Sequence, residues 1–578
     1  MKIQDLLHQT RDAMRPEEAY ALLVAITAKL KSGGSLDEIT VSQPRHREVL
    51  PLLEGSAKAL LALEPVERFR TLTSFFASPA AERTDLGWLR EEAVEQIIDM
   101  IDGAMSVRFS HVASFVPCLT YAHRMSLAGK TPSVRFTWIN ERECQLMRDM
   151  ATALDLEDII TVELAWPWER KVSGDADVEV VLPPFMMPIK HLATVPNRTL
   201  GLLGLEEGRK ARLNVETVSI ADAIENTRGR VILCVPEGEL FRMVGTEPVA
   251  RRALLDSGRL QAVMGVPSGM IFANTWVKTS LLVISAADAT SNAVRFIDLG
   301  HGTLSQKGRR GRAEILDDVS WSDILKGEAP DDRTLARDVT RDEIIENNTV
   351  LVPERYLNVG TREQIDALLA QCDVAELSEA VDLVRPVTIS ADEEGEYKLF
   401  EAAPGDVNER GFISTPKREI TVDRAKYNKA FNQQLRPGDV LLSIKGTVGV
   451  VGLVPNDVPR EGEKTIWTAG QSLMILRPKK RVNMSSLALY EYLSNDTVQD
   501  YIKSIAGGAA IQTIAMKDLK SFAIPVPDEK TVRAIEESFA ERQAIFNRID
   551  TLKMKLVDVR GRGWPHRLLN RSNPIKDS

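Results

Sequence analysis

Apolar residues recur every three or four positions through the first part of the chain, as in residues 19–25 and 92–98. This spacing places them on one face of a helix, whereas a half-buried strand would alternate apolar and polar positions. The run Gly33-Gly34-Ser35 interrupts the pattern as a loop between helices does. The sequence therefore predicts a helical domain over residues 1–105, suited to packing or to docking a partner.

The pattern changes after residue 105, where short apolar runs alternate with helical stretches. A helix is predicted at residues 143–154. Strands are predicted at residues 134–139, 159–164, 178–182, 231–235, 260–266 and 279–285. Alternating strands and helices predict a parallel sheet with helices on both faces, which binds ligands at the carboxyl ends of its strands. We expect an α/β domain over residues 106–388.

Charge becomes dense toward the end of this domain, and the texture changes again after it. Residues 304–345 are dense in charge and include the basic run 308–312, which fits either a solvated loop or a DNA contact. A linker is expected near residues 390–396. Short apolar runs separated by Gly and Pro turns then predict a β-rich α+β domain over residues 397–527.

The C-terminal part reads as one long helix. Residues 528–560 contain neither proline nor glycine. Their apolar residues repeat at mixed three- and four-residue steps, at Ile535, Phe539, Ile545, Ile549, Leu552 and Leu556. This pattern predicts an amphipathic helix that forms a packing or dimerisation seam. A loose basic tail is expected over residues 561–578.

Composition adds a limit on the class of protein. The 578 residues are 44% hydrophobic and 27% charged, which is ordinary for a folded protein of several domains. Lys and Arg number 73 and Asp and Glu 82, so the net charge is −9. This balance argues against a general polycation, but nucleic-acid binding needs only one basic face.

The cysteine positions and the lengths of the apolar runs indicate the cellular compartment and whether a metal site is expected. The four cysteines stand at 118, 144, 234 and 372, without a CxxC pair or a Cys/His spacing. We therefore expect neither a metal site nor a disulfide framework, as in a reducing cytoplasm. The N-terminus lacks the apolar core of a signal peptide, and no run reaches the roughly 18 apolar residues that span a bilayer. The predicted location is the cytoplasm, without membrane contact.

Three blocks, in this order, carry a resemblance to a known family. The first is 230–241 with 253–272 and 279–284, which reads as strand, "PxGxLF", helix, strand, "LPxGxF" and strand. It resembles the back half of the N6-adenine DNA methyltransferase subunit of type I restriction–modification systems. The second, Val352 to Leu357, resembles the "NPERY" segment of that subunit.

The third block lies in the β-rich domain. It comprises 435–443, Gly446, Gly449, Gln471-Ser472, Gly507-Gly508 and 524–527. It is similar to one target-recognition domain of the specificity subunit, followed by its spacer helix. The resemblance covers most of residues 70–560 and implies a methyltransferase fold joined to half a specificity subunit. It also implies that two copies, joined through their spacer helices, read two half-sites.

The resemblance implies S-adenosyl-L-methionine as cofactor, held by a "DPxCGSG" turn after the first strand. Residues 111–121 stand in its place and contain Pro117-Cys118 but no glycine. A turn that brings backbone close to a ligand favours glycine. Leu119 and Tyr121 are expected to occupy the space of the cofactor's methionine part. Glu141, after the second strand, fits either the acid that takes the ribose hydroxyls or a plain acid opening a helix.

The catalytic motif of the family is "[DN]PP[FYW]". Its first residue accepts a hydrogen bond from the target amine, and its aromatic residue stacks on the flipped base. This chain has Leu182-Pro183-Pro184-Phe185, in which leucine offers no acceptor. A weaker "TP" remnant stands at Phe75 to Pro79. We expect the fold to be kept with catalysis lost or weak, since losing such an electrostatic group commonly costs about two to three orders of magnitude in rate.

The expected DNA contacts lie in the recognition domain. Basic and polar residues that suit phosphate and base contacts are Lys426, Lys429, Lys445, Lys479, Lys480, Arg481, Gln512 and Thr513. A run such as 479–481 also fits a solvated turn. The glycines at 446 and 449 fit turn formers.

The sequence leads to one function and two alternatives. The expected function is sequence-specific recognition of double-stranded DNA in a restriction–modification-like phage-defence assembly. The partner is a second copy, joined through the C-terminal helix, or other defence subunits. No nuclease pair and no GxxxxGK[ST] loop is seen. The alternatives are an active S-adenosylmethionine-dependent N6-adenine methyltransferase and a protein-binding scaffold or regulator.

Overall fold

The computed structural model forms two compact units. Unit 1 comprises residues 1–359 with 508–510, and unit 2 comprises 360–507 with 511–578. The sequence placed the boundary later, near residue 388. The structure describes residues 3–35, 39, 46–78, 89–110, 114–169, 176–190, 192–205, 212–243, 245–272, 277–308, 312–327, 332–357, 359–391, 395–459, 464–479, 482, 484–506 and 512–562.

Unit 1 begins with the helices that the sequence predicts. They are α1 (Ile3–Thr10), α2 (Pro16–Lys31), α3 (His46–Leu61), α4 (Pro65–Thr73), the 3-10 helix η2 (Ser74–Ala77) and α5 (Glu91–Ile101). Their buried faces meet around Tyr20, whose ring stacks on Phe75 at 3.9 Å. The Tyr20 hydroxyl donates to the Leu72 carbonyl at 2.8 Å. The helical N-terminal prediction is confirmed.

A nine-stranded sheet follows in unit 1. Its order is β11-β8-β6-β7-β5-β4-β1-β2-β3. The strands are β1 (Ser106–Ser110), β2 (Ser133–Trp138), β3 (Ile160–Leu164), β4 (Val178–Val181), β5 (Arg230–Pro236), β6 (Leu260–Val266), β7 (Thr279–Ile284), β8 (Ala293–Asp298) and β11 (Ala336–Thr340). In the register, Phe109 lies beside Phe136 on one side and Val180 on the other.

The prediction of a parallel sheet is wrong for two strands. β7 runs antiparallel to β5 and β6, and β11 runs antiparallel to β8. A parallel return needs a long crossover, usually a helix, and the described residues between β6 and β7 contain none. β7 therefore turns back beside β6. The other predicted strands and the helix at 143–154 are confirmed within about two residues at each end, the usual uncertainty of such boundaries.

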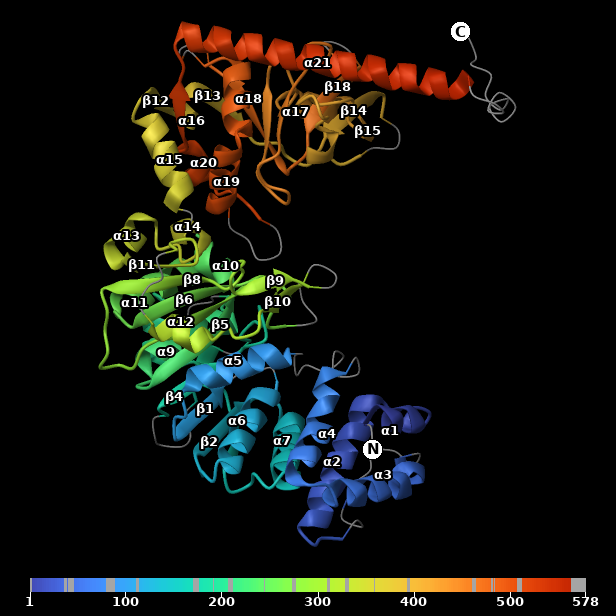
Figure 1. Ribbon diagram of the computed structural model, residues 1–578, viewed down its shortest axis with the longest axis vertical. Helices are drawn as coiled ribbons and strands as arrows, with labels where there is room; N and C mark the ends of the chain where they lie inside the picture. Colours follow the sequence, from blue (N-terminus) through green and yellow to red (C-terminus); the bar gives the residue numbers. More distant parts are fainter. Residues whose placement is uncertain are drawn as a thin grey trace. The chain divides into compact units, whose positions relative to one another are not determined.

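Helices cover both faces of this sheet, as expected (Figure 1). They are α6 (Val116–Leu127), α7 (Glu141–Ala153), η4 (Leu192–Thr194), α8 (Asn197–Leu202), α9 (Val215–Glu225), α10 (Gly238–Phe241), α11 (Glu247–Asp256), α12 (Trp321–Lys326), α13 (Arg341–Glu346) and α14 (Glu354–Leu357). A short hairpin pairs β9 (Ser305–Lys307) with β10 (Ala313–Ile315). One core packs the N-terminal helices against one face of the sheet. A second core fills the other face, beneath α9 and α11.

Unit 2 is the β-rich domain that the sequence predicts. Its sheets are β13-β19-β16-β17, β15-β14-β18 and β12-β20. The strands are β12 (Asp373–Glu376), β13 (Val381–Val384), β14 (Tyr397–Ala402), β15 (Arg418–Val422), β16 (Val440–Ser443), β17 (Val451–Leu453), β18 (Thr465–Ala469), β19 (Leu473–Pro478) and β20 (Ala523–Val526). β12 and β13 precede residue 388, yet they pair with β20 and β19 of this unit.

Helices pack on the sheets of unit 2. They are α15 (Val359–Leu369), α16 (Leu377–Ala380), the 3-10 helix η6 (Pro404–Asp406), α17 (Arg424–Phe431), α18 (Ser486–Ser494), α19 (Asp496–Ile505) and α20 (Met516–Lys520). The inner faces of β16 and β19 pack on α18 and α19, and their other faces pack toward Trp467 and Leu435. A small third core lies under α17 and β14.

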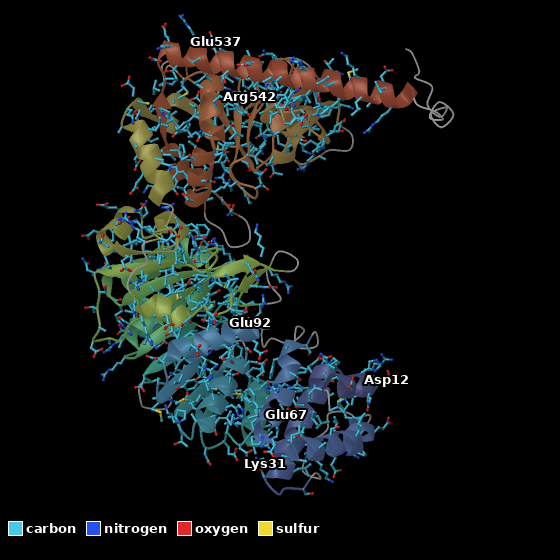
Figure 2. All side chains as sticks on the ribbon, in the orientation of Figure 1. Asp12, Lys31, Glu67, Glu92, Glu537 and Arg542 are labelled. Carbon is cyan, nitrogen blue, oxygen red and sulfur yellow. The ribbon has the colours of Figure 1, made fainter. Side chains whose placement is uncertain are left out.

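The long C-terminal helix is also confirmed. α21 runs over Glu529–Arg562, 34 residues without a break (Figure 1). Arg542 of α21 (Figure 2) forms an ion pair with Glu491 of α18. Among the described residues, no helix combines the length and the apolar character needed to cross a membrane. The expected basic tail, 561–578, lies almost wholly outside the described residues.

Candidate functional site

The sheet of unit 1 reverses its order beside β1. The chain passes from β1 to β2 and β3 on one side and then adds β4 on the other. Open α/β sheets bind ligands at such a switch point, outside the carboxyl ends of the strands. Ser110 ends β1, opposite Val181 of β4. The segments after these two residues therefore form the candidate ligand site, although residues 111–113 lie outside the described residues.

The four-residue motif lies directly after β4, at this edge. Leu182 is fully buried in the core beneath the N-terminal helices. Pro183 is also buried, whereas Pro184 and Phe185 are half-buried. The Phe185 ring contacts the edge of Phe272, with centroids 5.1 Å apart and planes at 77°. The position of a hydrogen-bond acceptor is therefore taken by an apolar side chain inside the core.

The segment after β1 is packed with aromatic side chains. Ser114 caps the turn, and its Oγ accepts from the Val116 N–H at 3.3 Å. Phe115 is fully buried, with its ring 5.7 Å from Phe76 and 5.3 Å from Phe136, edge to face in both cases. This is the segment at which the resemblance places a glycine-rich, cofactor-holding turn.

Pro117 and Cys118 lie in the first turn of α6. Both are buried. Burial raises the pKa of the Cys118 thiol well above its ordinary value, so this sulfur is an inert core group. Leu119 is buried beside them, in the same core.

Tyr121 does not lie at the ligand edge, and that part of the prediction is wrong. Its hydroxyl donates to the carbonyl of Ala104, which precedes β1. α6 returns along the sheet from the carboxyl edge, so a residue five positions after Val116 has already travelled toward the amino ends of the strands. Burial raises the pKa of Tyr121 to about 12.

Glu141 lies where the sequence places it, after β2. It is the exposed first residue of α7, and Asn140 caps the helix by accepting from the N–H groups of Arg142 and Glu143. The Trp138 indole donates to Glu143. An acid at this position suits the helix dipole and equally suits a ribose, so both interpretations remain.

Taken together, the described residues do not fit S-adenosylmethionine. Glu141 offers a carboxylate for the ribose hydroxyls. The buried Phe115 ring, however, fills the space after β1. Leu182 supplies no polar atom at the end of β4. Of these two positions, only Phe115 bears on cofactor binding, because the motif residue at Leu182 meets the target amine.

A charged cluster on the neighbouring strands was not predicted. Lys278 Nζ lies 2.8 Å from Glu237 Oε1, just after β5, and also pairs with Glu354 of α14. Burial lowers the pKa of Lys278, but the carboxylates of Glu354 and Glu237 raise it more, so the net shift is upward. The cluster fastens the segment Val352–Leu357 to the sheet. Lys278 and Glu354 are 76 positions apart, so no local pattern joins them.

Three segments of unit 2 are joined by backbone hydrogen bonds into a platform around Lys445. The N–H groups of Ile444 and Lys445 donate to the Ser472 carbonyl at 2.8 and 3.2 Å. Gly446 donates to the Gln512 carbonyl at 2.9 Å, and Ile514 donates to the Ile444 carbonyl at 3.0 Å. Lys445 also bridges Thr513 in antiparallel fashion. The structure therefore brings together Lys445, Gln512 and Thr513, which the sequence named as separate candidate contacts.

Glycine conformation shapes this platform. Gly446 has φ +81° and Gly449 has φ +93°, a region that side chains with a Cβ rarely adopt. A Cβ on Gly449 would also lie 2.6 Å from Gln499 Oε1. The turn between β16 and β17 is thus fixed by its glycines, as the sequence indicated.

The exposed side chains of the platform suit nucleic acid. Lys445, Thr447, Gln471 and Gln512 are exposed, and they come from all three segments. A lysine suits phosphate or a guanine edge, and glutamine amides pair with adenine edges in the major groove. Gln471, in the turn before β19, was named only as part of a motif; its adjacency to Lys445 arises from pairing across the sheet.

The remaining predicted contacts are dispersed. Lys479 donates to the Ser378 carbonyl at 2.7 Å and lies 3.4 Å from Asp382, so its charge is used within the domain. Lys426 is half-buried and donates to the Ala391 carbonyl at 3.4 Å. Lys429 is exposed on α17. Lys480 and Arg481 lie outside the described residues.

Two family models match the chain, one after the other. Residues 210–364 match N-6 DNA Methylase. Residues 374–554 match the type I restriction modification DNA specificity domain. The chain joins an N-6 DNA methylase segment to a type I specificity domain. The first match covers the later strands of unit 1, and the second covers the platform and most of α21.

Individual relatives are distant. The specificity subunit of the Escherichia coli type I restriction enzyme EcoBI is 22% identical over 221 residues, which cover 37% of this chain and 41% of that subunit. A type I methyltransferase subunit from Streptococcus thermophilus has a TM-score of 0.45 at 17% identity, over 61% of this chain and 84% of its own. The type IIG endonuclease BpuSI has a TM-score of 0.42 at 10% identity, over 93% and 74%.

Proposed function

We propose that this chain is the sequence-specific DNA-recognition component of a restriction–modification defence system against phage, working in the cytoplasm. Unit 2 reads double-stranded DNA through the platform around Lys445. Unit 1 keeps the methyltransferase fold, with methyl transfer lost or weak. The observation that carries the proposal is the joining of three segments, each with an exposed polar side chain, into one surface of a specificity domain.

The platform has the properties that direct readout requires. Its backbone hydrogen bonds fix the three segments before DNA arrives, so little conformational freedom is lost on binding. Lys445 supplies a positive charge, and Gln471 and Gln512 supply amides that both donate and accept. Phosphate contacts give affinity, whereas amide contacts to base edges give specificity.

The loss of methyl transfer is supported by two separate positions. Leu182 cannot accept a hydrogen bond from the adenine amine, and it is fully buried. Phe115 is packed in the core after β1, where the family leaves room for its cofactor. Each change acts on a different requirement, one on catalysis and the other on cofactor binding.

The layout of a specificity subunit also implies a contact between the long helix and a partner protein. The long helix α21 joins this module to another helix, either in a second copy or in another subunit of the assembly. In either arrangement the assembly reads a longer DNA site than one recognition domain does.

The test combines two titrations of the full chain. Calorimetry with S-adenosylmethionine should give no binding heat, while random duplex DNA should be shifted in an electrophoretic assay, less so at high salt. Micromolar cofactor binding followed by methylation of adenine would favour the active methyltransferase. Absence of any salt-sensitive DNA binding would favour the protein scaffold.

A further inference from the structure

A cavity of about 1150 Å³ lies within unit 2. Its described lining comes from α15, α18, α19, β20 and the first turns of α21, together with short segments next to them. No residue of the platform around Lys445 is among these lining residues. Sites for small molecules usually measure roughly 300–1,000 Å³, so this cavity has room for a short peptide segment.

Part of the cavity wall is apolar. Ile365 of α15, Met484 before α18 and Val498 of α19 line it, and each is no more than 4% exposed. Leu368, one turn after Ile365, also lines it and is 45% exposed. Covering such an apolar wall removes apolar surface from water, which favours the binding of a ligand with apolar side chains.

The charged residues that line the cavity are all acidic. Among the described lining residues, Asp373, Glu491 and Asp528 carry carboxylates, and none is Lys, Arg or His. Glu491 is already paired with Arg542 of α21. The carboxylates of Asp373 and Asp528 therefore decide which charge a ligand should carry.

These two carboxylates are accessible to a cationic ligand. Asp373 is exposed on β12, and no ion pair joins it to another residue that the structure describes. Asp528 is exposed and accepts from the Thr531 N–H at 2.7 Å. The hydrogen bonds from Thr531 and the charge of Lys530 lower the pKa of Asp528, so this carboxylate is ionised at neutral pH. The cavity thus combines an apolar wall with negative charge.

The residues that follow α21 have the complementary chemistry. Leu568 and Leu569 stand directly between two arginines in the sequence. Arginine pairs well with carboxylates because its planar guanidinium can donate two parallel hydrogen bonds. Three basic residues and one acid make up the Lys, Arg, Asp and Glu content of 563–578: Arg567, Arg571, Lys576 and Asp577.

This leucine pair cannot reach the cavity of its own chain. α21 lines the cavity at Thr531 and Ile535 and ends at Arg562. The helix from Ile535 to Arg562 spans about 40 Å. The chain from Arg562 to Leu569, even when fully extended, spans at most about 25 Å. A leucine pair in the cavity therefore comes from a second copy of the chain.

We propose that the unit 2 cavity binds residues 567–571 of a second copy, with the two leucines on the apolar wall and the two arginines at the carboxylates of Asp373 and Asp528. Burial of the leucines supplies most of the binding free energy. The two arginines make the segment selective for this acidic cavity. This contact goes beyond the proposed function, because neither surface belongs to the platform that reads DNA.

The first test uses a synthetic peptide of residues 561–578 with a fluorescent label. Titration with the full chain at low salt should raise its anisotropy with a Kd in the micromolar range, and added salt should weaken binding. A second peptide with Leu568→Ser and Leu569→Ser keeps the charge. It should bind at least about tenfold more weakly, because each leucine loses about 1.5 kcal/mol or more of burial.

Variants of the full chain place the peptide in the cavity. Leu368→Arg adds a positive charge to the wall and should abolish binding without unfolding, because Leu368 is exposed. The double variant Asp373→Asn/Asp528→Asn should weaken binding by at least about threefold. Asparagine at 528 can still accept from the Thr531 N–H, so the start of α21 is kept.

A matched control removes the same charge elsewhere on α21. Glu537, labelled in Figure 2, and Glu541 are exposed and do not line the cavity. Glu537→Gln/Glu541→Gln should bind the peptide as the parent chain does. Equal binding by the parent, Leu368→Arg and control chains would place the peptide outside the cavity and overturn the proposal.

A disulfide test shows whether the contact joins two copies. Cys372 lines the cavity and is exposed, whereas the other three cysteines are buried. The full chain with Asn570→Cys, treated with diamide, should form a covalent dimer on a non-reducing gel. Adding Cys372→Ser should remove this dimer. A dimer that persists with Cys372→Ser would mean that two tails meet each other, which would overturn the proposal.

The same preparations are assayed for DNA binding. If Arg567→Gln/Arg571→Gln weakens the DNA shift while the full chain does not bind the peptide, the segment contacts DNA and the proposal is wrong. If the peptide binds in the cavity while the DNA shift fails, the proposed function is lost and the contact between copies stands.

Discussion

Lys278 Nζ and Glu237 Oε1 lie 2.8 Å apart at the carboxyl edge of the unit 1 sheet. Glu237 is almost fully buried, and the same lysine pairs with Glu354. Removing the Lys278 side chain would leave the carboxylates of Glu237 and Glu354 close together without its positive charge. The segment Val352–Leu357, which resembles a family motif, is held to the sheet by this cluster.

Lys278→Met should therefore destabilise unit 1. Breaking a buried pair leaves a charge without compensation, and the partial exposure of Lys278 reduces the cost to about 2 to 3 kcal/mol. Urea unfolding followed by tryptophan fluorescence measures the change. Arg252→Ala, which breaks an exposed pair with Asp256 at 2.8 Å, is the control and should cost less than about 1 kcal/mol. Equal costs for both variants would contradict the assignment.

Glu239 should make unit 1 less stable as pH rises from about 5 to 7. Burial raises the pKa of Glu239 to about 7, although Thr217 donates to its carboxylate at 2.8 Å. Its folded pKa lies above its unfolded value, so the folded state binds more protons in this window and loses stability as protons leave. Glu239→Gln should flatten the dependence, and the difference from the parent at pH 8 should be on the order of 2 kcal/mol. A parent whose melting temperature rises over this window would contradict the sign.

Leu182→Asn should not restore methyl transfer. The change returns the acceptor of the family motif, but Phe115 still occupies the core after β1. It also buries an amide, which should destabilise unit 1 by about 2 to 4 kcal/mol. Transfer of a labelled methyl group to duplex DNA measures activity. Methylation by this single variant would show that the cofactor site is intact.

Lys445→Ala and Gln512→Ala should affect DNA binding in different ways. Loss of the exposed lysine should weaken binding to all sequences and reduce the slope of log affinity against log salt by about 1. Loss of the glutamine should relax sequence preference by about 1 to 3 kcal/mol at one base pair, with the salt slope unchanged. Lys530→Ala, an exposed lysine on the first turn of α21, is the matched control. If all three variants bound DNA with the same affinity, salt slope and sequence preference, the platform would not be part of the DNA interface.

Local sequence patterns predicted most of the helices and strands. The strand 178–182 and the helix from Glu529 were predictable because apolar spacing alone defines a strand or a helix. The antiparallel course of β7 was not predictable from alternation, since strand direction depends on which neighbour the chain returns to. Likewise, the sequence offers no local sign that β13, before residue 388, pairs with β19.

For the site as well, features set by local sequence were predictable, whereas features set by contacts between distant segments were not. The place of Leu182 at the end of a strand and the turn at the glycines near Lys445 were predictable because strand ends and turns are short, contiguous patterns. Tyr121 was misplaced because the direction of α6 was not considered, and five residues of helix span about 7.5 Å. The pairing of Lys278 with Glu354 and the adjacency of Gln471 to Lys445 depend on contacts between distant segments, which only the folded chain reveals.

We expect the platform around Lys445 to read a defined DNA sequence. Selection of bound duplexes from a random library by the full chain, followed by sequencing, tests it most directly. We expect one short sequence to be enriched. The Lys530→Ala control should select the same sequence, whereas Gln512→Ala should lose the preference at one base pair. Recovery of an unenriched library, from a chain that binds DNA or from one that does not, would contradict it.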